Sequence, residues 1–406
     1  MADLDLLVVG AGPAGVAAAC TAVGRGLHVA VLDRARFPRD KVCGDGLTAG
    51  ALRLLEGLGV DVPTVASTTP VDTVVLRGPD GRRVVLPLPS DGLRSVVTRR
   101  RELDSALVDR ARAVGVTIDE ERLVTSVRTD ADHVAVEHTD PDGGDPRRVT
   151  ARFVVAADGH WSTVRRCVDP SGGNALGSWH AFRQYFRGVD ERRLWVLFEE
   201  DLLPGYAWVF PLPDGRANVG FGVLRDPATT GKALAATWRD LTERPSLRSV
   251  LGPDAEPDDR HRAWPIPADY DPRRTTTGRV LFVGDAAGVV DPMTGEGVAQ
   301  ALETGILAAT AVADGGPVAA VTARYRTGVD RALGRDLRFA ARLQQVLRAP
   351  LGVRGALRCV DTSDWTRRNF ARWMFEDYPR ALLFTPDRWR RGGFRPPGAF
   401  RVPTPT

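Results

Sequence analysis

Cysteine, histidine and long apolar runs are all scarce in this sequence. Its four cysteines are scattered over 406 residues without the spacing of a zinc site or a disulfide framework, as is typical of a reducing compartment. The six histidines form no cluster, so no metal site is expected. No apolar run reaches the ~18 residues of a membrane-spanning helix, and the N-terminus reads as a strand instead of a signal peptide. We therefore expect a cytoplasmic protein.

Lysine is scarcer still, since Lys41 and Lys232 are the only two and arginine carries nearly all the positive charge. The formal net charge of +4 is small for this length, and no basic run is interleaved with a nucleic-acid module, so no nucleic-acid partner is expected. The hydrophobic fraction of 43% is that of an ordinary globular core, and the length predicts two or three domains.

The N-terminal segment has the pattern of a dinucleotide-binding turn. Residues 4–9 are a continuous apolar run, typical of a buried parallel strand, and they lead into Gly10-Ala11-Gly12-Pro13-Ala14-Gly15. The first glycine allows the tight turn, the second lets the backbone approach a pyrophosphate, and the third lets the following helix, 13–25, pack on the strand. A second apolar strand ends at Asp33, where a ribose-hydroxyl acceptor is expected.

Two later segments complete the pattern. Asp158-Gly159 follows an apolar strand, and residues 284–297 read Gly-Asp-Ala-Ala-Gly-Val-Val-Asp-Pro-Met-Thr-Gly-Glu-Gly. Taken singly, each has the alternative of a tight strand-to-helix turn in an α/β protein. Their order and spacing together predict one dinucleotide site assembled from distant parts of the chain, and the dinucleotide expected is FAD.

Composition changes along the chain and predicts a discontinuous organisation. Alanine-rich helices and buried strands occupy residues 1–72, 98–170 and 269–325, the expected FAD-binding domain. Aromatic, alternating strands in 73–97 and 171–268 predict a mostly antiparallel substrate-binding sheet. Residues 326–406 are expected to be a helical region. The fold class predicted is α/β, a Rossmann-type FAD-binding domain with an inserted β-sheet substrate domain and a C-terminal helical tail.

The three segments resemble those of the p-hydroxybenzoate-hydroxylase-like flavoproteins, and three details resemble their geranylgeranyl reductase family. A loop similar to that family's flavin-side loop is Phe37-Pro-Arg-Asp-Lys41-Val-Cys43-Gly44-Asp45-Gly46-Leu47. The third segment has Gly288 and ends Pro292-x-x-Gly295-Glu296-Gly297, where aromatic hydroxylases usually carry His and Gly-Gln-Gly. A substrate-side signature is resembled by Tyr206-Ala-Trp208-Val-Phe210-Pro211 and Gly220-Phe221-Gly222. The resemblance covers about residues 1–310.

This resemblance implies a role for each part of the FAD site. Amides of residues 294–298 would face the isoalloxazine ring, Asp285 would bind ribitol or the pyrophosphate side, and Asp158 and Ser162 would lie near the pyrophosphate. Arg100 would reach the nucleotide, unless it is one more surface arginine of the run 99–101. The full set expected to bind FAD is Gly10, Gly12, Ala14, Gly15, Asp33, Arg34, Cys43, Gly44, Arg100, Asp158, Gly284, Asp285, Pro292, Gly295, Gly297 and Val298.

Reduction of a C=C bond needs a hydride donor and a proton donor on opposite sides of a dry cavity. Cys43, in a glycine-flanked loop, and Glu296 are the catalytic candidates. The alternatives are that Cys43 is inert packing and that Glu296 is structural at a helix start. The substrate contacts expected are Tyr206, Trp208, Phe210, Gly220, Phe221 and Gly222. The alternative for this aromatic stripe is a sheet face packed on its own core.

Four functions compete for this sequence. The leading one is an FAD-dependent reductase that saturates a double bond of an isoprenoid or other hydrophobic metabolite, with NAD(P)H or ferredoxin as the electron donor. A flavin monooxygenase is second, and Gly288 disfavours it. A halogenase is third, because Trp264-Pro265-Ile266-Pro267 only half resembles the Trp-x-Trp-x-Ile-Pro signature and neither lysine lies where that class is expected to carry one. A non-catalytic FAD- or lipid-binding protein is fourth, and the intact Cys43 loop disfavours it.

The C-terminal tail mixes aromatic and cationic residues. Residues 365–401 hold three Trp, five Phe, one Tyr and nine Arg against three acidic residues, which suits a membrane interface. Proline at 379, 386, 396 and 397 prevents one long amphipathic helix and favours the alternative, a helix pair that caps the substrate domain. We expect at most weak peripheral membrane contact through this tail.

Overall fold

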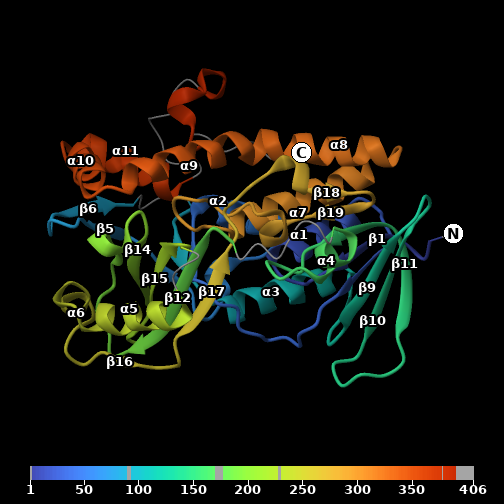
Figure 1. The fold of residues 1–406 in the computed structure, drawn as a ribbon, viewed down its shortest axis with the longest axis horizontal. Helices are drawn as coiled ribbons and strands as arrows, with labels where there is room; N and C mark the ends of the chain where they lie inside the picture. Colours follow the sequence, from blue (N-terminus) through green and yellow to red (C-terminus); the bar gives the residue numbers. More distant parts are fainter. Residues whose placement is uncertain (1, 89–92, 170–176, 227–229, 377, 390–406) are drawn as a thin grey trace.

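A computed structural model describes residues 2–88, 93–169, 177–226, 230–376 and 378–389. Two large β-sheets lie side by side, and C-terminal helices run along the top of both (Figure 1). This arrangement is the α/β class with a second, mostly antiparallel sheet that the sequence predicts. The division of the chain at residues 72/73, 97/98, 170/171, 268/269 and 325/326 stays a prediction.

The first sheet carries the glycine-rich turn. Its strands run in the order β18-β19-β11-β1-β2-β8, and every pair from β19 to β8 is parallel. The strands are β1 (Leu4–Val9), β2 (Val29–Leu32), β8 (Thr117–Asp119), β11 (Arg147–Ala156), β18 (Thr276–Thr277) and β19 (Val280–Phe282). A hairpin of β9 (Leu123–Thr129) and β10 (Val134–Thr139) joins β11.

Helices cover this sheet, and two of them approach closely. A Cβ on Gly305 would lie 2.2 Å from the Ala14 carbonyl oxygen, so the absence of a side chain lets the two helices touch. They are α1 (Pro13–Gly24) and α7 (Val298–Ala313); the others are α2 (Ala49–Gly57), α3 (Arg100–Ala113), α4 (Thr163–Val168) and α8 (Val318–Val329). Both α1 and α7 begin at the carboxyl end of the parallel strands, where nucleotides bind in such folds.

The second sheet has the order β16-β12-β15-β14-β13-β5-β6, with β17 on β12. All its pairs are antiparallel except β13 with β5. Its strands are β5 (Thr73–Arg77), β6 (Arg83–Pro87), β12 (Trp179–Arg187), β13 (Leu194–Leu197), β14 (Tyr206–Leu212), β15 (Arg216–Leu224), β16 (Glu256–Pro257) and β17 (Arg262–Ile266). One face packs on α5 (Gly231–Glu243) and α6 (Pro245–Leu251), and the other faces the nucleotide side.

The C-terminal region is helical, as predicted, and it caps the second sheet. Ala371 of α11 shares a buried apolar cluster with Val84 and Leu86 of β6. After α8 and the short π-helix Asp330–Gly334 come α9 (Arg335–Leu347), α10 (Pro350–Val360), α11 (Asp364–Phe375) and the 3-10 turns η7 (Leu382–Phe384) and η8 (Pro386–Arg388). Residues 390–401 of the predicted interfacial tail lie outside the described residues. Within the described ranges, no helix has the length and apolarity to span a bilayer.

Candidate active site

The β1–α1 turn forms one end of a groove that fits a pyrophosphate. Gly10 has φ +103°, and a Cβ there would lie 2.4 Å from the Ala157 carbonyl oxygen. A Cβ on Gly12 would instead face open space, with Arg39 Nη2 nearest at 3.6 Å. No side chain caps α1, so its first amides are available to an anion. Gly15 packs the helix on the turn, since a Cβ there would lie 1.8 Å from the Gly10 carbonyl oxygen.

Asp33 lies at the end of β2, beside this turn. Its carboxylate accepts hydrogen bonds from the Ala11 amide, at 2.6 Å, and the Ala35 amide, at 2.8 Å. It therefore holds the glycine turn while lining the same cavity as Arg34 and Ala14. This is the position from which a carboxylate contacts the ribose in dinucleotide-binding folds.

The second segment brings a buried acid to the groove. Asp158 accepts from the Val164 amide at 3.1 Å through Oδ2, and burial raises the pKa of its carboxyl. Its Oδ1 is buried without a partner among the described residues, as is His160 Nε2 on the same cavity wall. Orphaned buried polar atoms of this kind fit a polar ligand that the structure does not contain. Ser162, expected near the pyrophosphate, accepts from the Arg165 amide and caps α4.

The third segment leads into α7. Gly284 has φ +55° and fits against Ala14 and Ala301, and the next residue, Asp285, lies 3.5 Å from Lys41 Nζ. Asp291 then holds the turn before the helix, because its Oδ1 accepts from the amides of Met293 and Thr294.

These contacts correct one expectation about the amides of residues 294–298. The Thr294 amide donates to Asp291 Oδ1 and the Gly295 amide to the Asp291 carbonyl, so neither is free for the flavin. Gly297 caps α7 without a side-chain hydrogen bond, which leaves the first amides of the helix, from Val298 onward, for an anionic group. Of the residues predicted to bind FAD, Gly15 does not line the cavity, whereas the others, Gly295 and Pro292 included, do.

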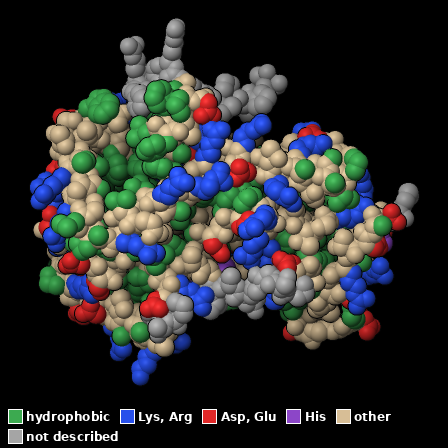
Figure 2. Space-filling model, turned by 45° about the horizontal axis from the view of Figure 1, so that its top comes forward, with side chains coloured by type: hydrophobic (Ala, Val, Ile, Leu, Met, Phe, Trp, Pro, Cys, Tyr) green, Lys and Arg blue, Asp and Glu red, His purple; other side chains and the backbone are tan. Residues whose placement is uncertain are grey.

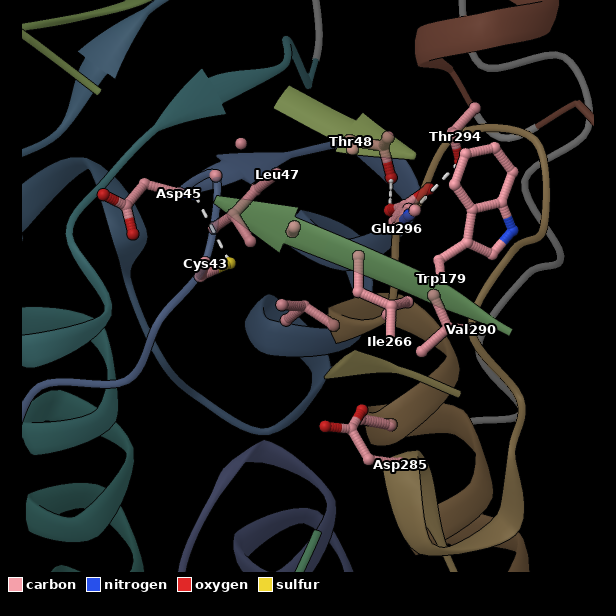
Figure 3. Close-up of a pocket in the computed structure, with 18 of the residues that line it drawn as sticks. Cys43, Asp45, Leu47, Thr48, Trp179, Ile266, Asp285, Val290, Thr294 and Glu296 are labelled. Atoms are coloured by element: carbon pink, nitrogen blue, oxygen red, sulfur yellow. Dashed lines mark hydrogen bonds between the residues drawn. The ribbon is translucent and has the colours of Figure 1, made fainter. Parts of the chain in front are cut away.

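One cavity of about 1210 Å³ connects this groove to the second sheet and the C-terminal helices. Its volume exceeds the ~300–1,000 Å³ of a pocket for one ligand, so it has room for a dinucleotide and a second molecule. Figure 3 shows Cys43 and Asp45 on one side of the pocket and Thr48, Thr294 and Glu296 on the other.

Cys43 lies where the groove meets the second sheet. Burial raises the pKa of its thiol, an effect that the Arg100 guanidinium opposes, and its Sγ accepts from the Asp45 amide at 3.3 Å. Arg100 is buried and pairs with Asp104 at 2.8 Å, so it is not a surface arginine. The thiol thus keeps its proton at neutral pH beside a fixed cation.

A buried hydrogen-bond network fixes the Cys43 loop. Asp45 has φ +66° and is 1% exposed, and its Oδ2 accepts from Tyr185 Oη at 2.7 Å and Asn218 Nδ2 at 2.8 Å. Asn218 Nδ2 also donates to the Cys43 carbonyl, and its Oδ1 accepts from Trp208 Nε1 at 2.9 Å. Burial raises the pKa of Asp45 to about 6. This network links the Cys43 loop to the aromatic strand β14.

The aromatic stripe forms one wall of the cavity. Tyr206, Trp208 and Phe210 alternate along β14 and all line it. The indole of Trp208 lies over Gly220, where a Cβ would come within 2.3 Å of the ring. Gly44 and Gly46 contact the same wall, since their Cβ atoms would lie 3.4 and 3.1 Å from the Phe210 ring. Glycine at these positions lets the Cys43 loop and the wall approach one another.

The structure corrects the prediction that Phe221 contacts the substrate. Side chains alternate along β15, so Phe221 points away from the neighbouring Gly220 and Gly222, onto the opposite face of the sheet. It is fully buried, with its ring 5.2 Å from that of Phe182 and 6.1 Å from that of Trp238 on α5. It belongs to the core and does not line the cavity. Gly222 lines it, and Gly220 contributes only by making room for Trp208.

Glu296 is held by the protein. Thr48 Oγ1 donates to its Oε1 at 2.5 Å, and Arg380 Nη2 lies 3.9 Å from its Oε2. These contacts join α2, the start of α7 and the C-terminal region. They favour the structural alternative for Glu296, although it lines the cavity.

Sequence reasoning missed several cavity residues. Asp45 and Lys41 were visible in the Cys43 loop but carried no assigned role. Lys41 Nζ lies 4.0 Å from the centroid of the Trp264 ring, and burial lowers the pKa of Lys41, with Asp285 opposing. Asn218 had no local signal, because only the pairing of β14 with β15 brings it to Trp208.

A family model described as an FAD binding domain matches residues 3–314. A menaquinone reductase of Mycolicibacterium smegmatis is 32% identical, with 85% of each chain covered. Digeranylgeranylglycerophospholipid reductase 2 of Methanopyrus kandleri is 31% identical over 85% of this chain and 86% of that protein.

The chain belongs to the geranylgeranyl reductase family of FAD-dependent oxidoreductases. Among solved structures, a geranylgeranyl bacteriochlorophyll reductase-like protein of Thermoplasma acidophilum superimposes with a TM-score of 0.79 at 21% identity, covering 95% of this chain and 98% of that one. A flavin-dependent halogenase has a TM-score of 0.70 at 25% identity and covers 94% of this chain and 71% of that one. The fold is thus shared by reductases and halogenases, while the relatives above 30% identity are named reductases.

Proposed function

We propose that this flavoenzyme reduces C=C bonds in the prenyl chain of a lipid, such as a polyprenyl quinone or an isoprenoid glycerolipid. The single observation that carries the proposal is the cavity wall of Tyr206, Trp208 and Phe210, which continues from the Cys43 loop into apolar side chains of α9, α10 and α11. An apolar channel of this kind fits a long hydrocarbon chain such as a prenyl chain. The relatives named as menaquinone and digeranylgeranylglycerophospholipid reductases support this substrate class.

FAD, when bound and reduced, supplies the hydride that such a reduction requires. A proton must also reach the second carbon, and the Cys43 thiol is the donor we propose, because it lines the cavity, is protonated at neutral pH and lies beside the aromatic wall. Loss of that proton leaves a thiolate that the Asp45 amide and the Arg100 guanidinium stabilise. Thr48 and Arg380 hold Glu296, so we assign it to positioning the start of α7. NAD(P)H or ferredoxin as electron donor stays a prediction.

A halogenase is the second candidate, and Lys41 is the observation that favours it. This lysine lines the cavity, and its Nζ lies over the ring of Trp264. Trp264 belongs to the segment that half resembles the halogenase signature. Its Asp285 neighbour and the cation–π contact hold it away from the aromatic wall, which counts against a reacting lysine.

Mass spectrometry of the product separates the candidates. Reduced holoenzyme is incubated without oxygen with a menaquinone or a digeranylgeranyl glycerophospholipid in detergent, and in a parallel sample with air and bromide. We expect a gain of two hydrogens per reduced bond without oxygen. Product that contains oxygen or bromine, formed only in air, would instead identify a monooxygenase or a halogenase.

A further inference from the structure

The exposed apolar side chains of this protein are concentrated in the C-terminal helical region. Of the large hydrophobic side chains that are exposed in the described chain, only Val85 lies outside residues 346–389. Leu351 is 77% exposed and Phe384 71%. The others in this set, which we call the apolar rim, are Val346, Trp365, Leu383 and Trp389. Apolar residues scattered singly need no explanation, but a cluster of this size indicates a binding surface.

The C-terminal part of the apolar rim is anchored. The Phe384 ring lies 5.4 Å from that of Phe339 on α9, and Trp389 Nε1 donates to the Leu382 carbonyl at 2.8 Å. Asp336 of α9 accepts from the Ala381 amide at 2.9 Å and from Arg388 Nη1 at 2.7 Å. These contacts hold η7 and η8 on α9, so the protein presents these side chains to solvent on fixed turns.

The substrate cavity opens within the apolar rim. Trp365 and Leu383 are exposed at the surface and also line the cavity. In Figure 2, where the top of Figure 1 is turned forward, hydrophobic side chains surround a hollow on the α10–α11 side, with Lys and Arg side chains beside them. Apolar side chains of α9, α10 and α11 line the cavity between this opening and the aromatic wall, so a prenyl chain that enters here can follow them inward.

Charge on this region is strongly positive. Residues 335–376 contain nine arginines and four acidic residues, although the whole chain has a formal net charge of only +4. Arg342, Arg348, Arg358 and Arg368 are exposed and make no ion pair with any residue that the structure describes. Arginines without carboxylate partners beside exposed Trp, Leu and Phe match the boundary between lipid headgroups and acyl chains.

We propose that the apolar rim and these four arginines form a docking surface for an anionic lipid bilayer, so that the cavity opens into the lipid phase. The rim enters the acyl boundary while the arginines contact the headgroups. Delivery of a membrane lipid is the part that rests on the proposed function, whereas the docking itself can be measured without turnover. A second copy of this chain would cover the apolar side chains, but it would bring the same excess of arginines to the contact and leave them without a match.

Co-sedimentation of the FAD-loaded protein tests the surface. The vesicles are phosphatidylcholine alone or mixed with phosphatidylglycerol, at low and high salt, with no reductant or substrate. We expect binding to the anionic vesicles at low salt, and at least a tenfold loss in the Leu351→Asp/Phe384→Asp variant, which changes no cavity-lining residue. The affinity of the Arg348→Glu/Arg358→Glu variant for anionic vesicles should also fall at least tenfold, because each arginine near an anionic surface contributes about fivefold to the affinity.

Matched variants control for added charge. Val85→Asp puts an acid at the exposed apolar position outside the rim, and Arg128→Glu/Arg148→Glu reverses two exposed arginines on the distant strands β9 and β11. Both variants should bind vesicles like the parent. Bound flavin per protein verifies the fold of each variant. Absence of vesicle binding, or equal binding by rim and control variants, would overturn the proposal. So would a dimer in solution that Leu351→Asp/Phe384→Asp dissociates without any vesicle binding, and neither result would alter turnover of a detergent-dispersed substrate.

Discussion

Gly12 faces the nucleotide groove, and the atom nearest to its missing Cβ is Arg39 Nη2, 3.6 Å away. A Gly12→Val substitution therefore leaves the protein free to fold but places two methyl groups where the pyrophosphate approaches. We expect purified Gly12→Val protein to contain no flavin, measured as absorbance per protein. Gly24→Val, at the other end of the same helix with open space around it, should keep its flavin. Full flavin content in Gly12→Val would refute the site assignment.

Cys43 differs from the other half-buried thiols by its place between the nucleotide groove and the aromatic wall. A serine hydroxyl is a poorer acid, so Cys43→Ser should slow transfer to the alkene by roughly 10²-fold, the lower range for a lost general acid, while the reduction of FAD keeps its rate. Stopped-flow measurement of the two half-reactions distinguishes them, and Cys167→Ser on α4 is the control. Equal rates in both variants would reduce Cys43 to a packing residue.

Asp45 should make the free energy of unfolding depend on pH, and the direction of its pKa shift gives the sign of that dependence. Burial raises its pKa from 3.8 to about 6, so the folded state binds this proton more tightly than the unfolded chain does. Its stabilising effect is complete below about pH 4 and is lost as the pH rises through 6, and a shift of about two units is worth roughly 3 kcal/mol. Asp45→Asn cannot ionise, so its free energy of unfolding should change less between pH 4 and pH 7.

Denaturant unfolding at both pH values checks this difference, with the exposed Asp109→Asn on α3 as control. Because the Asp45 network also holds the Cys43 carbonyl, Asp45→Asn should in addition change the pH profile of thiol alkylation at Cys43. Identical pH dependences of stability in parent and variant would show that Asp45 does not take up this proton in the folded state.

At the scale of elements, the two faces of the β14–β15 pair have different roles, since one lines the cavity and the other packs on α5. Trp208 pairs in register with Gly220, and one residue further along β15 the side chain turns to the α5 core. Trp208→Ala should leave FAD bound and raise the KM for substrate, with ~2 kcal/mol of lost apolar contact, or roughly 30-fold. Phe221→Ala should instead destabilise the fold by about 3–5 kcal/mol without a comparable change in KM.

Thermal unfolding, flavin content and steady-state kinetics of the two variants test that division. If Trp208→Ala unfolds and loses FAD, the stripe is core and not a substrate wall.

Local sequence patterns predicted most of the helices and strands. They failed where contacts between distant segments decide the structure. The β5–β6 hairpin lies within residues 73–97, where the sequence predicts strands, since turn residues and alternation define it locally. Helices α5 and α6 were missed inside a region read as strands, because aromatic composition there masked the helical spacing of Leu234, Trp238 and Leu241. The prediction that Phe221 contacts the substrate was wrong for a similar reason. The alternation of side chains along the strand was visible in the sequence, but the position of Phe221 inside the Gly220-Phe221-Gly222 signature was given more weight.

At the scale of the whole molecule, the C-terminal region reaches back to the nucleotide site. Gln344 Nε2 of α9 donates to the Pro292 carbonyl at 3.0 Å, and Arg380 Nε lies 3.4 Å from Asp291 Oδ2. Asp291 is the buried acid that holds the turn before α7, so a segment of the helical tail supports the helix that is predicted to face FAD. The tail therefore joins the opening of the cavity to the cofactor end.

Removal of the Arg380 charge tests this connection. Arg380→Gln leaves the Asp291 carboxylate buried without its cation, which costs a few kcal/mol in such pairs, and the turn before α7 should loosen. We expect FAD to bind about tenfold or more weakly by fluorescence titration, together with a lower Tm. Arg335→Gln is the matched control, because its pair with Asp387 at 2.7 Å is half exposed and worth under ~1 kcal/mol. Equal FAD affinities in the two variants would show that the tail supports only the substrate sheet and not the cofactor site.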